Sequence, residues 1–347
     1  MQRQAEAAAA DGPATCVAPA CTHKHRPRIA LLSNPKSTGN LAQLPRIRAY
    51  CADHPDVFHY EVEHVDQIAQ AMRTIARVRP KVLAINGGDG TVQAALTELY
   101  NGGHFAAGAP PVAVLPSGKT NLIALDLGAQ GDPIAALERL IEIAQGDLAP
   151  YIVPRELIAL RSGGVDKPVI GMFLGGAGLA DTMVYCREKI YPLGLPSGLS
   201  HVLTALALLA KLFLRAKAGF LPPDPHPLNL SMNNQPSLLN GRFSLLAVTT
   251  LEKLLLSTEL DGKRQGSLKL LAVEERPVSM MRAFAASIGG KLGRAQLRGV
   301  HFKEADEITI ESDNSSVILD GETFRAESGR PIHLRTAQPL SFVKLAA

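Results

Sequence analysis

The chain of 347 residues carries 46% hydrophobic and 20% charged residues and a formal net charge of +4. This balance excludes an intrinsically disordered chain and leaves room for one large domain or two ordinary ones. The small positive charge gives no reason to expect nucleic acid as a partner, and it suits an anionic lipid surface only where basic residues cluster.

The start of the chain predicts a tail. Residues 1–26 are small, polar and proline-containing and lack the apolar run of a signal peptide, so we expect them to be disordered. The cysteines at positions 16, 21, 51 and 186 have no framework spacing. Their scatter favours the reducing cytoplasm over a secreted disulfide scaffold.

Residues 27–150 alternate short apolar runs with segments of helical spacing. The expected strands are residues 28–33, 57–62, 82–85 and 112–115. The expected helices are residues 41–51, 66–78, 92–100, one beginning at 121, and 133–144. This alternation predicts an α/β domain in which a parallel sheet lies between helices and ligands bind at the carboxyl ends of the strands.

Residues 151–347 have a different pattern. Short apolar runs separated by turn residues predict a mostly antiparallel sandwich or barrel, with the domain boundary near Pro150. The runs are residues 157–160, 169–174, 243–249, 268–273, 307–310 and 317–319. A helical insertion at residues 199–217 is expected to interrupt them.

The sharpest motif is Gly-Gly-Asp-Gly-Thr at residues 87–91, between an expected strand and an expected helix. Gly87, Gly88 and Gly90 allow main-chain amides to converge on an anion, and the helix directs its positive end at the same point. Thr91 could hold a phosphate oxygen, and Asp89 could bind a metal or accept a hydroxyl proton. A tight turn with a capping aspartate is the alternative.

Two more polar turns follow neighbouring strands, at residues 34–40 and 115–121. Because the carboxyl ends of parallel strands meet at one edge, the three turns predict a nucleotide site there. The candidate ligands in these two turns are Asn34, Ser37, Thr38, Gly118, Thr120 and Asn121. Neither turn is a Walker loop, because Gly118-Lys119-Thr120 lacks the glycine five positions earlier.

At these turns the sequence resembles the diacylglycerol kinase catalytic-domain family, and within it bacterial lipid kinases related to sphingosine and ceramide kinases. The resemblance covers residues 28–343 and also includes a glycine-rich segment at 169–181 and Leu-Asp-Gly-Glu at 319–322. It implies a Rossmann-like nucleotide domain, of the NAD kinase and diacylglycerol kinase type, joined to a β-sandwich. ATP, Mg²⁺ and a lipid bearing the acceptor hydroxyl would then meet between the two domains.

The resemblance also implies residue roles. The backbone of residues 87–91 would hold the ATP phosphates, Thr38 would contact the nucleotide, and Glu322 and Asp320 would supply the general base. The residues alone leave a surface hairpin turn open for the last pair, and Asp89 competes as base or metal ligand.

The chain departs from the family at two places. Lys119 stands where the family has threonine, and Leu122 where it has a second aspartate. Gln265 begins the turn that resembles the family's structural magnesium site, so we do not carry that site over.

Two segments favour a lipid partner. Residues 182–223 contain five bases and one acid, and residues 276–303 contain six bases and no acid. Flanked by apolar residues, they suit peripheral binding to an anionic membrane surface, although a core helix with a solvated basic end gives the same pattern.

The sequence leaves open whether the chain forms a homodimer. The alternative functions are a kinase of a soluble acceptor, like NAD kinase, and a non-catalytic nucleotide or lipid sensor.

Overall fold

The computed structural model describes residues 28–118, 121–163, 167–185, 225–233, 235–251, 266–288, 292 and 296–346. Several predicted features lie outside these residues, so the structure says nothing about them. They are the disordered tail at 1–26, the helical insertion at 199–217, and the side chains of Lys119, Thr120 and Gln265.

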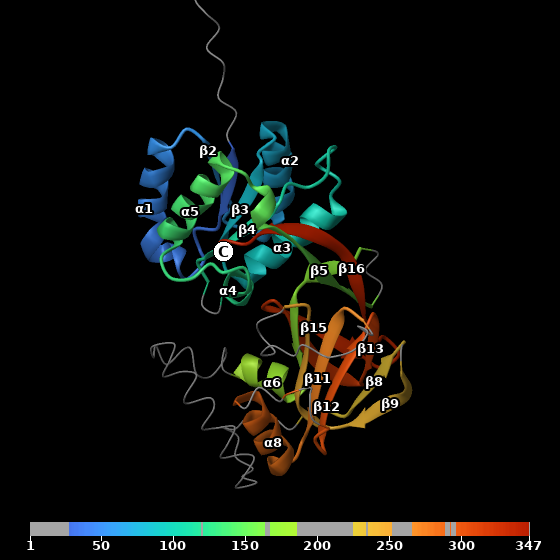
Figure 1. Ribbon diagram of the computed structural model, residues 1–347. Helices are drawn as coiled ribbons and strands as arrows, with labels where there is room; N and C mark the ends of the chain where they lie inside the picture. The colour runs from blue at the N-terminus through green and yellow to red at the C-terminus, as the bar shows by residue number, and fades with distance from the viewer. Residues whose placement is uncertain are drawn as a thin grey trace, which may run out of the picture.

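The first half is the predicted α/β domain. Its parallel strands, in the sheet order β2-β1-β3-β4, are β1 (Ile29–Ser33), β2 (Val57–Glu61), β3 (Val82–Gly87) and β4 (Val112–Pro116). Its helices are α1 (Asn40–Asp53), α2 (Ile68–Val78), α3 (Asp89–Asn101), α4 (Leu122–Asp126) and α5 (Pro133–Gln145), with 3-10 turns at Val65–Gln67 and Ala149–Tyr151. Helices α1 and α5 lie on one side of the sheet and α2 and α3 on the other (Figure 1). Strands β1, β3 and β4 are largely apolar because they are buried on both faces of the sheet.

The second half is mostly antiparallel, as predicted. One group of strands extends the first sheet: β5 (Ile152–Ser162), β6 (Val169–Gly171), β8 (Leu228–Met232), β9 (Gln235–Gly241), β13 (Glu307–Glu311) and β16 (Ile332–Val343). The rest form a second sheet in the order β12-β11-β10-β7-β14-β15, with bounds β7 (Phe173–Gly176), β10 (Phe243–Thr249), β11 (Leu268–Glu274), β12 (Val300–Ala305), β14 (Asn314–Leu319) and β15 (Glu322–Glu327). A second hydrophobic core lies between the sheets, and helices α6 (Gly178–Tyr185) and α8 (Pro277–Ile288) pack on the second sheet.

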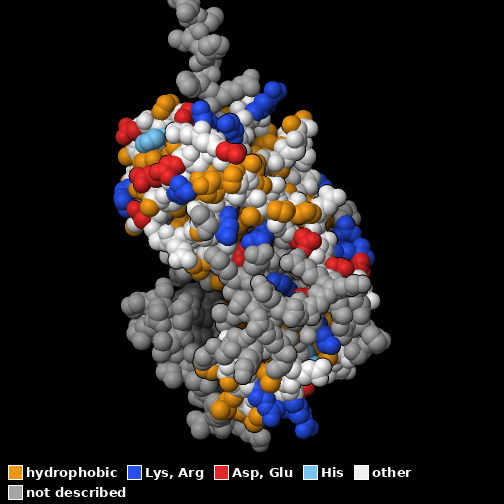
Figure 2. Space-filling model, viewed as in Figure 1, with side chains coloured by type: hydrophobic (Ala, Val, Ile, Leu, Met, Phe, Trp, Pro, Cys, Tyr) orange, Lys and Arg blue, Asp and Glu red, His pale blue; other side chains and the backbone are white. Residues whose placement is uncertain are grey.

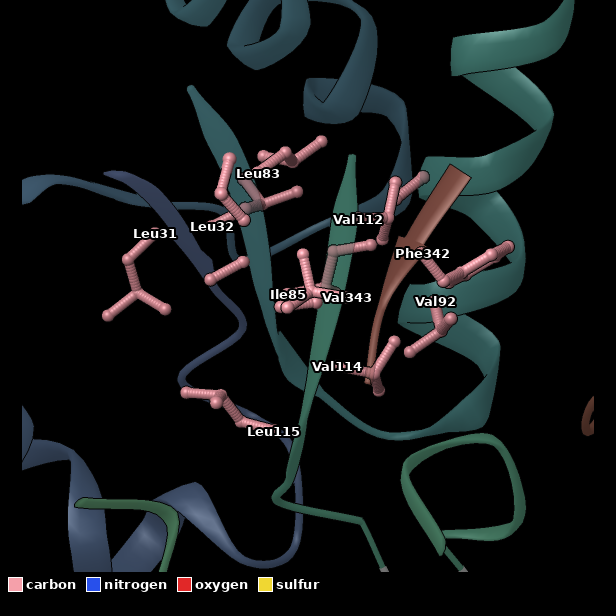
Figure 3. Close-up of a cluster of buried hydrophobic side chains, with 14 of the residues drawn as sticks. Leu31, Leu32, Leu83, Ile85, Val92, Val112, Val114, Leu115, Phe342 and Val343 are labelled. Carbon is pink, nitrogen blue, oxygen red and sulfur yellow. The ribbon is translucent and has the colours of Figure 1, made fainter. Parts of the chain in front are cut away.

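Strand β16 connects the two halves. It runs antiparallel to β5 along most of its length and parallel to β4 where Phe342 is opposite Val112. Phe342 and Val343 are fully buried among side chains of β3 and β4 (Figure 3). One sheet therefore runs through both halves, and the end of the chain packs into the first core; the boundary near Pro150 stays a prediction.

The apolar run at residues 169–174 contributes to two strands, one in each sheet. The chain crosses between the sheets at Met172, so that β6 pairs with β5 in the first sheet and β7 pairs with β10 and β14 in the second. The apolar run Val-Ile-Gly-Met-Phe-Leu suits either sheet and gives no signal for the crossing.

Among the described residues, no helix combines the length and the apolar content needed to cross a bilayer.

Candidate active site

Buried polar side chains tie together the carboxyl ends of β1, β3 and β4. The Asn86 amide donates to Ser33 Oγ at 2.9 Å, and its carbonyl oxygen accepts a short hydrogen bond from Ser117 Oγ. All three side chains are at most 1% exposed. Because a buried polar group without a partner is costly, this closed network fixes the relative position of the three strand ends.

The first turn is fastened to the third in the same way. Ser37 Oγ donates to the carbonyl of Ser117 at 2.7 Å, and the amide of Gly39 donates to the same oxygen at 3.1 Å. The Asn40 side chain donates to the carbonyl of Asn86 at 3.0 Å. Sequence reasoning missed Asn40, Asn86 and Ser117 as organising residues, although Asn86 lies near the end of β3 and Ser117 directly follows β4.

The glycine turn leaves an open set of amides. A Cβ on Gly118 would lie only 3.0 Å from the Cα of Gly88 and 3.7 Å from the amide nitrogen of Asp89. Helix α3 begins at Asp89, and within the described residues the amides of Asp89 and Gly90 have no acceptor. Free amides at a helix N-terminus bind anions, so the arrangement suits a phosphate.

The predicted hydroxyl and amide ligands differ in whether their side chains are exposed or already hydrogen-bonded within the protein. Asn34 Nδ2 donates to Thr91 Oγ1 at 2.9 Å, and Asn121 Oδ1 accepts from the amide of Gly118 at 2.6 Å. Ser37 and Thr91 are buried, whereas Thr38 is exposed. These residues other than Thr38 therefore hold the turns together, and Thr38 offers an exposed hydroxyl at the rim.

The turn between β14 and β15 reaches the start of α3. Asp320 (φ 43°) and Gly321 (φ 97°) form a two-residue hairpin turn of the kind that Asp-Gly favours. A Cβ built on Gly90 would lie 3.3 Å from Glu322 Oε1, and one on Gly321 would lie 3.9 Å from the Gly90 amide nitrogen. The glycine turn and the Asp-Gly-Glu segment, far apart in sequence, therefore lie side by side.

The two carboxylates of this turn have different surroundings. The Asp320 carboxylate is buried and accepts hydrogen bonds from the amides of Met172 at 2.8 Å and Phe173 at 3.0 Å. Asp320 thereby clamps the point where the chain crosses between the sheets. Glu322 is exposed beside Gly90. Of the two, Glu322 is the one free to meet a substrate.

Burial sets the protonation of the aspartates. It raises the pKa of Asp89 to about 6. Burial also raises the pKa of Asp320 to about 7, with a smaller contribution from the negative charge of Asp89, against two amide hydrogen bonds that lower it. Two neighbouring acids with raised pKa values are a typical feature of functional sites.

The site suits a magnesium ion only when phosphates are present. The described residues contain no cluster of three or more histidine, cysteine, aspartate or glutamate side chains placed to hold a metal. Mg²⁺ often takes one or two protein carboxylates and completes its shell with water and substrate phosphates. Asp89, next to the amides that face an anion, fits that mode.

Replacing Asp320 by alanine should lower the free energy of unfolding by about 2–5 kcal/mol, because the buried amide of Met172 and the partly buried amide of Phe173 lose their acceptor. The effect should be largest at low pH. The carboxyl, whose pKa rises from 3.8 to about 7 on folding, stays neutral in the folded protein while the unfolded chain ionises, so its stabilisation declines as pH rises from about 4 through 7. Urea unfolding at several pH values measures this. Asp320→Asn, which keeps the turn and one acceptor, should lose less; equal losses in both variants would contradict the clamp.

Comparisons with known proteins agree with this architecture. Residues 28–149 match the family model of the diacylglycerol kinase catalytic domain. No curated protein matches the chain. The chain is similar to a crystal structure of a diacylglycerol kinase from Bacillus anthracis str. Sterne, with 17% identity, a TM-score of 0.58, and coverage of 92% of this chain and 97% of that one. A second structure from that organism, proposed to be a diacylglycerol kinase, has 18% identity, a TM-score of 0.60, and coverage of 91% and 97%. The structures establish the shared fold, and the family match confirms the predicted resemblance over residues 28–149.

Proposed function

We propose that this protein transfers the γ-phosphoryl group of ATP to a hydroxyl group of a lipid, because residues 28–149 match the family model of the diacylglycerol kinase catalytic domain. One observation carries the proposal. The open amides of Asp89 and Gly90 lie beside the exposed carboxylate of Glu322, so the groups that would bind a phosphate donor and accept a proton lie next to each other.

Phosphoryl transfer depends mainly on positioning and on neutralising charge. The amides at the start of α3 bind the triphosphate, and the rigid network of Ser33, Asn86 and Ser117 holds the turns that surround it. Glu322 accepts the proton of the acceptor hydroxyl as its oxygen bonds to the γ-phosphorus and the bond to the β-phosphate oxygen breaks, leaving ADP. Mg²⁺, held with Asp89 as its protein ligand, supplies positive charge to the phosphate oxygens when bound.

The lipid acceptor and the cytoplasmic location are parts of the proposal that rest on the family resemblance and on composition. Diacylglycerol is the first acceptor to test, followed by sphingoid bases and ceramide. A soluble acceptor such as NAD is the alternative within the same chemistry.

The test is a labelling assay. Purified protein is incubated with γ-labelled ATP, Mg²⁺ and, separately, diacylglycerol, sphingosine, ceramide or NAD, and products are separated by thin-layer chromatography. We expect label in a lipid product and none in NADP. Label in NADP alone would contradict the lipid assignment. If the protein binds ATP but yields no labelled product from any of these acceptors or from a total bacterial lipid extract, it is a nucleotide or lipid sensor instead.

A further inference from the structure

Helix α8 exposes an apolar stripe. Val278, Met281 and Phe284 are 55%, 59% and 69% exposed, and their spacing of three residues places them along one side of the helix. The opposite side, including Ala286, packs with Leu271 and Val273 of β11. The helix is therefore fixed to the sheet by one face while its other face presents large apolar side chains to solvent.

Basic residues are frequent in the sequence around this helix. From position 276 to position 303 the sequence has six Lys or Arg residues and no acid. Arg282 donates to the carbonyl of Arg298 at 3.2 Å, and in the described part of the chain neither guanidinium has an acidic partner. Arg276 lies 3.5 Å from Glu274, at the edge of the cluster. Figure 2 shows hydrophobic and basic side chains together at the bottom of the view, over α8.

We propose that the exposed face of α8 docks on an anionic lipid bilayer. The apolar stripe enters the boundary between headgroups and acyl chains, and Arg282 and Arg298 meet the anionic headgroups. Charge complementarity selects the bilayer as the occupant, because the same cations would repel each other across an interface between two copies of α8. The inference rests on the proposed function, since a lipid acceptor resides in a bilayer.

The docking face is joined to the active site through one sheet. Phe173 of β7 packs against the same cluster that holds α8, and its amide donates to Asp320 at 3.0 Å. Asp320 in turn sets the turn that carries Glu322. A bilayer held at α8 would therefore stand in a fixed relation to the carboxylate that receives the acceptor hydroxyl.

The test compares variants on vesicles. Binding is measured by co-sedimentation with phosphatidylcholine vesicles that contain or lack phosphatidylglycerol. We expect the unmodified protein to prefer the anionic vesicles and the double variant Met281→Gln, Phe284→Gln to bind them about tenfold more weakly. The variant Arg282→Gln, Arg298→Gln should lose most of the preference for phosphatidylglycerol and most of the salt sensitivity. Leu238→Gln, at an apolar side chain 54% exposed on β9, is the matched control and should bind normally.

Two further readouts separate this inference from the proposed function. Activity on a short-chain, water-dispersed acceptor should be unchanged in the α8 variants, whereas failure of the kinase assignment would leave vesicle binding intact. Normal vesicle binding by the Met281 and Phe284 variant would overturn the docking proposal. An equal loss of vesicle binding in Leu238→Gln would also overturn it, as would an unmodified protein that does not bind vesicles. A Met281 and Phe284 variant that changes from dimer to monomer but still binds vesicles normally would show that the stripe contacts a second copy instead.

Discussion

Glu322→Gln should slow phosphoryl transfer by about a hundredfold to ten-thousandfold, the range expected when a general base is lost. The substitution preserves size and removes only the charge. Glu322 is exposed, so folding should be unaffected, and the amides that face the phosphates belong to Asp89 and Gly90. The affinity for ATP should therefore stay within about threefold, and the loss should fall on kcat.

The control for this variant lies on the same strand. Glu327 is also exposed on β15, at its far end, where it pairs with Arg330. Glu327→Gln should keep full activity, because an exposed ion pair contributes little to stability and this one is remote from the glycine turn. Steady-state kinetics with γ-labelled ATP, alongside nucleotide binding by calorimetry, separates transfer from binding. A Glu322→Gln enzyme of normal speed would remove Glu322 from the role of base.

The first half of the fold could be predicted because its signals are local. Strands β1, β3 and β4 are buried on both faces, so each is a continuous apolar run that ends where polar residues begin. The glycine turn follows the same rule, since it stands between a buried strand and a helix. Their joint position at one rim then follows from the parallel arrangement alone.

Strand β16 could not be predicted in this way. It contains Pro339, which has no amide to donate, and its pairing with β5 is irregular between Ala337 and Leu340. A proline within a segment argues against a central strand, and no local pattern indicates that Phe342 will lie opposite Val112. The continuity of the sheet through both halves depends on pairings between distant segments.

In the candidate site, too, some features follow from local sequence and others depend on contacts between distant segments. The residue types at positions 320 and 322 indicate an acidic pair, but they do not indicate that the two carboxylates have different surroundings. Asp320 adopts a positive φ in the turn and bonds to the amide of Met172, 148 residues away. The roles of Asn86 and Ser117 as ties between turns depend likewise on contacts that sequence does not encode locally.

Asp89→Asn should lower kcat by about a thousandfold or more, since it removes the carboxylate that stands beside the phosphate-binding amides. It should also raise the concentration of Mg²⁺ needed for half-maximal activity, which Glu322→Gln should not do. The pH dependence gives a second measure. Because burial raises the pKa of Asp89 to about 6, kcat/KM should fall as pH drops through 6 and the carboxylate takes a proton. The asparagine variant should lose that dependence.

Stability separates a catalytic aspartate from a structural one. The pKa of Asp89 rises from 3.8 to about 6 on folding, so ionisation of this carboxyl lowers the free energy of unfolding as pH rises from about 4 to 6, and the full cost is present above pH 6. Asp89→Asn should therefore raise the free energy of unfolding at pH 8, by about 1–3 kcal/mol, while it abolishes turnover. Asp147→Asn, at an exposed turn aspartate, should change neither quantity. If the variant loses both activity and stability, Asp89 has a structural role. If it loses activity but gains stability, the carboxylate serves the reaction at a cost to the folded state.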